Sequence, residues 1–204
     1  MRDLEIRGAG NILGGEQHGH METVGYDMYL RLLSEAISRE KGEDVQEYGQ
    51  ECLVDMQIQA HIPDRYIENL SQRLEIYRRI ADIRTRDDAL DVTDELIDRF
   101  GEPPESVNGL IEVALLRNLA SGLGISEVKQ RDDCLLLYKP GFSLKNSADM
   151  AQMAALTSTL KKRVTLNASG KPYISVKIVS PMTPLDVLGE TLNLMEDARK
   201  SVKK

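Results

Sequence analysis

The fold class is decided by Cys52-Leu53-Val54-Asp55-Met56-Gln57-Ile58-Gln59-Ala60-His61-Ile62. Apolar side chains stand at every second position of this stretch, and polar side chains fill most of the positions between them. A period of two is typical of a β-strand that buries one face. The stretch therefore predicts a strand, which Pro63 ends because proline cannot donate to a strand ladder.

Helical periodicity replaces this alternation directly after Pro63. Asp64 is the expected N-cap of a helix, and its apolar stripe is predicted to be Ile67, Leu70, Leu74, Tyr77 and Ile80. A second helix is predicted from about Asp87 to Phe100. Its inward residues are expected to be Leu90, Thr93, Leu96, Ile97 and Phe100. Pro103-Pro104 is expected to begin a third helix.

Strand patterns return in the second half of the chain. Residues 125–130 and 134–138 flank one turn, and residues 163–167 and 173–179 flank another, so two hairpins are predicted. Ser147 is the expected cap of a helix that ends near Leu160, and a last helix begins at residues 183–186 and turns Leu185, Leu188, Leu192, Met195 and Val202 inward. Helices in blocks between hairpins indicate an α+β domain in which several helices pack on a small, mostly antiparallel sheet.

The first forty residues have a different character. Glycine is dense in Asp3-Leu4-Glu5-Ile6-Arg7-Gly8-Ala9-Gly10-Asn11-Ile12-Leu13-Gly14-Gly15-Glu16-Gln17-His18-Gly19. Glycine lets a chain bend sharply and lets other groups approach its backbone. A longer amphipathic helix is predicted next, with Gly42 as its stop. We therefore predict a helical hairpin and linker over residues 1–48 and a compact domain over residues 49–204.

The bulk composition limits the possible functions. The formal net charge of −7 argues against a general DNA-binding surface, because such affinity comes from many contacts between cations and phosphates. Nothing in the sequence resembles a membrane span or a secretion signal, so a cytoplasmic protein is expected. Cys52 and Cys134 stand alone, which favours reduced thiols over a zinc or redox site.

The N-terminal string resembles the motif Asp-Leu-x-Ile-Arg-Gly-x-Gly-x-x-x-Gly-x-x-Gln-x-Gly of bacterial double-stranded DNA translocases of the RecG and Mfd kind. Later strings are similar to strings of the transcription-repair coupling factor (Mfd) family. RecG-like enzymes are not expected to share them. These strings are Ile62-Pro63-Asp64-Arg65-Tyr66-Ile67, residues 73–81 and residues 95–101. The resemblance covers nearly the whole chain and weakens after about Ser126.

The resemblance implies a function. Members of this family are ATP-driven DNA translocases that displace stalled RNA polymerase and recruit the excision-repair protein UvrA. This chain would be a non-catalytic C-terminal part, with a translocation motif and a regulatory domain that masks the UvrA-binding surface. The implied partners are the N-terminal region and motor domains of the same protein, UvrA, RNA polymerase and duplex DNA, and no membrane. ATP and magnesium would belong to the parent motor, with no cofactor in this fragment.

Two groups of residues are candidates for this function. By resemblance, the translocation motif carries Arg7, Gly8, Gly10, Gly14, Gln17 and Gly19, whereas Gly15 and His18 depart from the family's usual Glu and Ser. Arg73, Arg78 and Arg79 begin a basic stretch that acidic residues interrupt. Such a stretch is usually a solvated helix face with weak ion pairs. The alternative is a docking face for another domain.

The sequence supports no catalytic site. A phosphate-binding loop needs Gly-x-x-x-x-Gly-Lys-Ser/Thr, which does not occur, and no serine or cysteine has a histidine beside it as a base. Glu16, His18 and His20 are interpreted as solvated loop residues rather than as metal ligands. The rival hypotheses are a stand-alone nucleotide hydrolase that uses the glycine loop, and a small nucleic-acid-binding or protein-interaction module.

Overall fold

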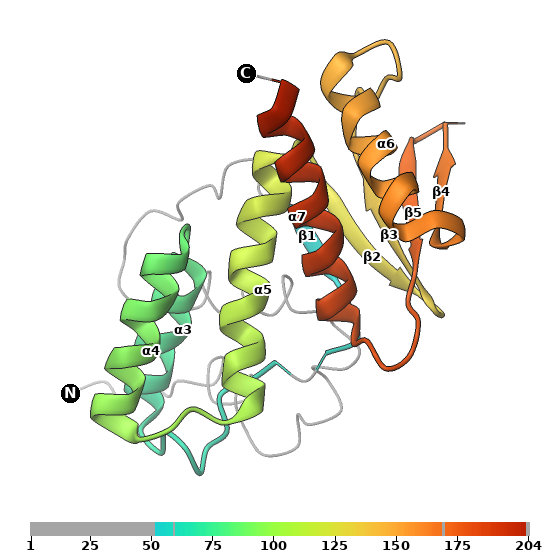
Figure 1. The fold of residues 1–204 in the computed structure, drawn as a ribbon. Helices are drawn as coiled ribbons and strands as arrows, with labels where there is room; N and C mark the ends of the chain where they lie inside the picture. The colour runs from blue at the N-terminus through green and yellow to red at the C-terminus, as the bar shows by residue number, and fades with distance from the viewer. Residues whose placement is uncertain (1–51, 59, 169, 203–204) are drawn as a thin grey trace, which may run out of the picture.

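The computed structural model describes residues 52–58, 60–168 and 170–202. The predicted helical hairpin and linker of residues 1–48 lie outside these ranges. Figure 1 shows that the described elements form an α+β domain, as the sequence predicts. They are, in chain order, β1 (Leu53–Asp55), α3 (Leu70–Ala81), α4 (Arg86–Phe100), α5 (Glu105–Gly122), β2 (Glu127–Arg131), β3 (Cys134–Tyr138), α6 (Ser147–Leu160), the short 3-10 helix Lys161–Arg163, β4 (Val164–Asn167), β5 (Tyr173–Lys177) and α7 (Pro184–Val202).

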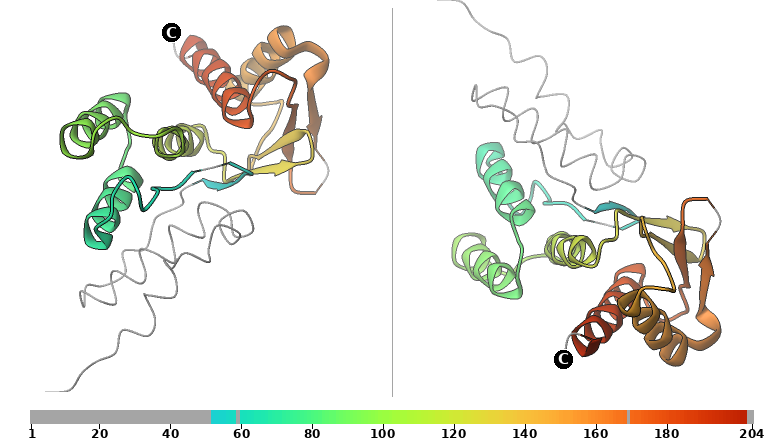
Figure 2. Two further views of the ribbon diagram at one scale, coloured as in Figure 1. Left: turned by 90° about the horizontal axis from the view of Figure 1, so that it is seen from below. Right: turned by 90° about the horizontal axis from the view of Figure 1, so that it is seen from above.

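The five described strands form one mixed sheet in the order β1-β2-β3-β5-β4. Only β1 and β2 run parallel, and the other neighbours are antiparallel, so the predicted mostly antiparallel sheet is confirmed. Both predicted hairpins are present, and β5 lies between β3 and β4. Figure 2 shows α6 and α7 on the same face of the sheet. The strands bury that face through Val54, Val128, Leu135, Leu137, Ile174 and Val176.

The first strand is much shorter than the sequence predicts. Ladder pairing stops after Asp55, although Met56, Ala60 and Ile62 remain buried. Beyond the ladder, the Ile58 N–H donates locally to the Met56 carbonyl at 3.1 Å. Alternating burial thus predicted which side chains lie in the core, but it did not predict how far the hydrogen-bonded strand extends.

The N-cap of helix α3 lies five residues after Asp64, the expected cap. This N-cap is Asn69, whose side chain accepts from Gln72 N–H at 3.1 Å. Residues 63–67 instead form a turn in which Tyr66 N–H donates to the Pro63 carbonyl at 2.9 Å. Asp64 was therefore wrong as a cap, and it pairs with Arg73 one turn into the helix.

Helix α4 occupies almost the predicted range, but the predicted inward face is wrong in part. Its buried residues are Ala89, Val92 and Leu96. The side chains of Leu90 and Ile97 are 61% and 41% exposed. Helical spacing alone allowed either stripe, and packing of α4 against α3 and α5 selected the one with smaller residues.

The remaining helices agree with the sequence prediction within a residue or two. Helix α5 starts directly after Pro104. Helix α6 is capped by Asn146 rather than by Ser147, since the Asn146 side chain accepts from Ala148 and Asp149 N–H groups. Helix α7 buries Leu188, Leu192 and Met195, whereas Val202 is 41% exposed and was wrongly predicted to face inward.

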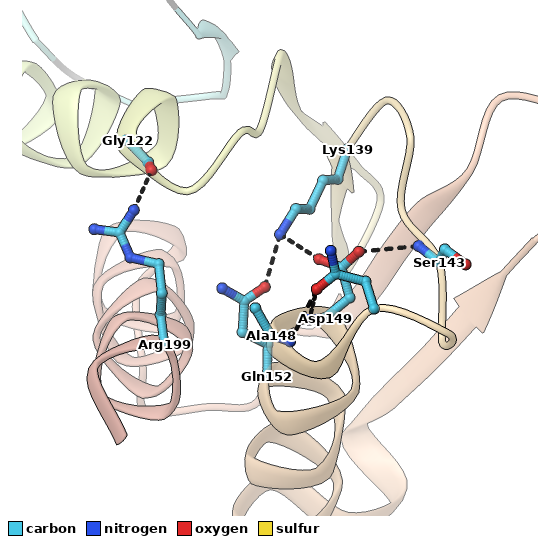
Figure 3. Close-up of polar contacts among 8 residues, drawn as sticks. Gly122, Lys139, Ser143, Ala148, Asp149, Gln152 and Arg199 are labelled. Atoms are coloured by element: carbon cyan, nitrogen blue, oxygen red, sulfur yellow. Dashed lines mark hydrogen bonds and ion pairs between the residues drawn. The ribbon is translucent and has the colours of Figure 1, made fainter. Parts of the chain in front are cut away.

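Three polar contacts join these layers. The Arg117 guanidinium of α5 donates to the Ala81 carbonyl at the end of α3, at 2.7 Å. Arg199 of α7 donates in the same way to the Gly122 carbonyl at the end of α5, as Figure 3 shows. Each satisfies a carbonyl that a helix end leaves without an intrahelical partner. The Lys139 ammonium of the loop after β3 pairs with Asp149 of α6 at 2.7 Å.

Candidate docking surface

The three arginines predicted as docking residues have different environments. Arg73 is only 7% exposed and contacts its own domain. Its guanidinium lies 2.7 Å from the Asp64 carboxylate and donates to the Ile67 carbonyl at 2.9 Å. Arg73 therefore fixes the turn that precedes α3, because burying a guanidinium requires partners for its charge and its donors. It is not presented to a partner.

Arg78 and Arg79 lie in the last turn of α3, where cations interact favourably with the helix dipole. Arg78 is half-buried, and Arg79 is exposed. Arg79 reaches across to α4 and lies 2.6 Å from the Glu95 carboxylate, which also pairs with Arg99 of its own helix. Arg79, Glu95 and Arg99 on the α3–α4 face are therefore already paired with one another.

A second feature of α4 did not enter the sequence interpretation. Four aspartates of this helix are exposed, and we call them the acidic stripe: Asp87, Asp91, Asp94 and Asp98. Their spacing of four, three and four residues puts them on one line along the helix. None of them has an ion-pair partner among the residues that the structure describes. The spacing was readable in the sequence, and it is the signal that was missed.

Repulsion along this stripe makes it a candidate docking surface. Aspartates that are three or four residues apart on a helix repel one another, and no cation in the described part of the chain relieves this. The first turn is an exception, because there the helix dipole favours negative charge. A partner that brings arginine or lysine to the stripe would remove repulsion as well as gain attraction.

Two polar groups at the ends of α4, the Asp88 carboxylate and the Tyr66 hydroxyl, are satisfied within the domain. Asp88 accepts the N–H groups of Arg84 and Thr85 at 2.9 and 2.8 Å and completes the capping box of α4. These hydrogen bonds, first those from the backbone, lower the pKa of Asp88. At the other end of α4, burial and the nearby Glu102 charge raise the pKa of Tyr66, whose hydroxyl donates to the Gly101 carbonyl at 2.7 Å.

The structure bears on few of the other predicted residues. Arg7, Gly8, Gly10, Gly14, Gln17 and Gly19, the predicted translocation motif, all lie outside the described residues. Within the described ranges, no three histidine, cysteine or acidic side chains are placed to hold a metal ion. The same part of the chain contains no helix long and apolar enough to cross a bilayer.

Comparison with known proteins defines the class of domain. The fold is similar to the crystal structure of the C-terminal domain of a transcription-repair coupling factor, with a TM-score of 0.65 and 23% sequence identity. That match covers 74% of this chain and 95% of the other. The sequence profile of the TRCF domain matches residues 56–163. The chain therefore belongs to the transcription-repair coupling factor family.

Curated relatives carry the same name. The transcription-repair-coupling factor of Bacillus subtilis (strain 168) is 33% identical over 206 aligned residues, which cover 100% of this chain. That of Staphylococcus aureus (strain USA300) is 39% identical over 132 residues, or 64% of this chain. The matches span only 17% and 11% of those relatives, so this chain corresponds to a small part of each.

Proposed function

We propose that this chain is the non-catalytic C-terminal part of a cytoplasmic, ATP-dependent DNA translocase, which displaces stalled RNA polymerase and recruits nucleotide-excision repair. Family membership supports the first part of this proposal, and the small share of each relative that is matched leaves room for a separate motor. ATP and magnesium would bind to that motor. The described domain would act by docking.

The acidic stripe is the observation that carries the docking role. It is exposed and lacks cationic partners among the described residues, and it lies beside the paired Arg79–Glu95 contact. We propose that the domain docks through this side of α4 on the N-terminal region of the same protein and masks the UvrA-binding surface there. Arg78 and Arg79 would lie at the rim of the contact, and Arg73 would support it only indirectly.

The test is a titration of UvrA against the full-length protein and against a protein truncated before residue 50, at fixed salt. A docked clamp with a coupling free energy of about 1–3 kcal/mol predicts that truncation tightens UvrA binding roughly 5–150-fold. Replacing Asp94 and Asp98 together by lysine should act in the same direction. The matched control is Asp197→Lys, an exposed position on α7. Equal dissociation constants for all four proteins would remove the regulatory proposal.

The translocation motif has a separate test in the full-length protein. We propose that Arg7 and Gln17 contact motor elements and DNA, because a planar guanidinium can hold a carboxylate or phosphate with two hydrogen bonds. Arg7→Ala should leave ATP hydrolysis intact while displacement of a stalled polymerase fails. His18→Ser is the control and should be nearly silent, since serine is the family's usual residue at this position. Normal displacement by the Arg7 variant would contradict the assignment.

A further inference from the structure

An open groove runs between α4 and α7, with α5 as its floor; we call it the helical groove. Figure 1 shows α5 lying between the other two helices. The groove has a volume of about 790 Å³. Its apolar lining includes Leu90 of α4 and Leu115, Leu116 and Leu119 of α5. This is a space that side chains of the described domain leave open.

Leu90 is unusually exposed for a large apolar side chain. It is 61% exposed, the largest exposed fraction among the large apolar side chains of the described residues. Leu115 and Leu119 are only partly buried. These side chains form an apolar strip inside a polar rim, and such an arrangement is typical of a site where an amphipathic helix binds.

The two ends of the helical groove carry opposite charge. One end is lined by Glu112 of α5, whose carboxylate interacts with the charge of Asp186 of α7, a residue that is not itself part of the lining. Partial burial, and then the Asp186 charge, raise the pKa of Glu112. Neither carboxylate has a cationic ion-pair partner among the described residues.

The other end is basic. It is lined by Arg84 and Arg86, before and at the start of α4, and by Lys200 near the end of α7. Glu196 also lines it and pairs with Arg199 at 2.7 Å and with Lys200 at 3.6 Å, whereas no described carboxylate forms an ion pair with Arg86. Asn118, six residues after Glu112 on α5, donates to the Arg84 carbonyl and fixes this end. Six residues of helix put the two ends roughly 9 Å apart along α5.

We propose that the helical groove binds an amphipathic α-helix of a partner protein, with the helix N-terminus beside Glu112. The partner's leucine-like side chains would contact Leu90, Leu115 and Leu119. A lysine or arginine in its first turn would pair with Glu112, and an acidic residue in its last turn would pair with Arg86. The helix dipole favours the same direction, because its positive end meets the Glu112 carboxylate. This inference is independent of the acidic stripe, which is on another side of α4.

The probe is a synthetic, end-capped helical peptide of about 14 residues with apolar residues at helical spacing, lysines in its first turn and glutamates in its last turn. A second peptide has glutamates at both ends. Binding to the complete 204-residue chain is measured by fluorescence anisotropy. The first peptide should bind saturably and more tightly than the second. Absence of saturable binding, or equal affinity for the two peptides, would overturn the proposal.

Two variants test the contacts. Glu112→Lys should weaken binding of the first peptide about fivefold or more, because the ion pair with its lysines becomes a repulsion. The same variant should strengthen binding of the second peptide, because its glutamates then meet a lysine. Leu90→Ser should weaken both peptides about tenfold, because it removes an apolar anchor. The matched controls are Glu68→Lys and Leu144→Ser, exposed positions outside the groove, and these should bind like the parent chain. Unchanged affinity in both groove variants would place the peptide elsewhere.

Sedimentation of the chain alone distinguishes another occupant. The proposal expects no self-association that depends on the groove. A dimer that Leu90→Ser dissociates and Leu144→Ser preserves would show that a second copy fills the groove, and it would overturn the assignment to a different protein.

Discussion

Lys139 and Asp149 form a nearly buried ion pair, with 2.7 Å between ammonium and carboxylate and side chains only 12% and 8% exposed. Figure 3 shows both groups together with Gln152 and Ser143. Lys139 also donates to the Gln152 amide oxygen at 2.7 Å, and Asp149 accepts the Ser143 N–H at 3.0 Å. The pair thus connects the loop after β3 to the first two turns of α6, and each charge has additional hydrogen bonds.

Breaking this pair should destabilise the domain strongly. Lys139→Met leaves the Asp149 charge without its cation in a poorly hydrated site, and the expected loss is about 3–5 kcal/mol in the free energy of unfolding. Lys139→Met combined with Asp149→Leu should cost less than the sum of the single changes, because no charge remains unpaired. Urea denaturation of the four proteins measures this double-mutant cycle. Additive losses would show that the two side chains act independently.

The N-terminal cap of α4 should make stability depend on pH in acid. Backbone hydrogen bonds hold the pKa of Asp88 below its ordinary value, so its stabilising contribution is present above the unfolded pKa of about 3.9 and is lost as pH falls through the lower folded value. Asp88→Asn should therefore lower stability at neutral pH and have progressively less effect in stronger acid. The control is Asp91→Asn, an exposed position on the same helix that makes no cap. Thermal melts from pH 2 to 7 compare the variants, and identical profiles would exclude a role for the Asp88 charge.

Glu112 should make stability depend on pH with the opposite sign to Asp88. Its pKa is raised by partial burial and by the Asp186 charge, so the folded state holds its proton more tightly than the unfolded chain does. The contribution of Glu112 to stability therefore falls as pH rises from its pKa in the unfolded chain to and through its higher pKa in the folded domain. Glu112→Gln should raise the melting temperature at pH 7, and the gain should shrink below about pH 4. Glu68→Gln, at an exposed position, should give no such trend. A Glu112 variant that melts at a lower temperature than the parent at pH 7 would contradict this reasoning.

Residues 50–204 should fold without the segment that precedes them. The described residues contain one contiguous apolar cluster that includes both Cys52 next to β1 and Met195 of α7. The Cys52 N–H donates to the Ser121 hydroxyl at 2.7 Å, which fixes the beginning of the domain on α5. A truncated chain should unfold in a single cooperative transition, with the same midpoint by circular dichroism and by tyrosine fluorescence. Non-coincident transitions or a molten state would show that residues 1–49 belong to the same folding unit.

The sequence was a good guide to the existence and type of the elements from residue 70 onward. Each long helix and both hairpins were predicted, because periodicity, turn residues and prolines act locally, but α3 begins six residues after Asp64, its expected cap. The candidate docking surface was predicted less well. Arg73 appeared as one of several exposed arginines, but its partner Asp64 stands nine positions earlier, and only the turn at residues 63–67 brings the two together. The acidic stripe, in contrast, could have been found by counting along α4.

By itself the sequence determined the α+β class, the family and the absence of a phosphate-binding Gly-x-x-x-x-Gly-Lys-Ser/Thr string, since these depend on local pattern and motif. Only the tertiary structure decided how short β1 is, and that Leu90 and Ile97 stay exposed while Ala89 and Val92 are buried. Both outcomes depend on neighbours that are distant in sequence. A strand ends where its partner no longer pairs with it, and a helix turns inward the face that fits the helices beside it.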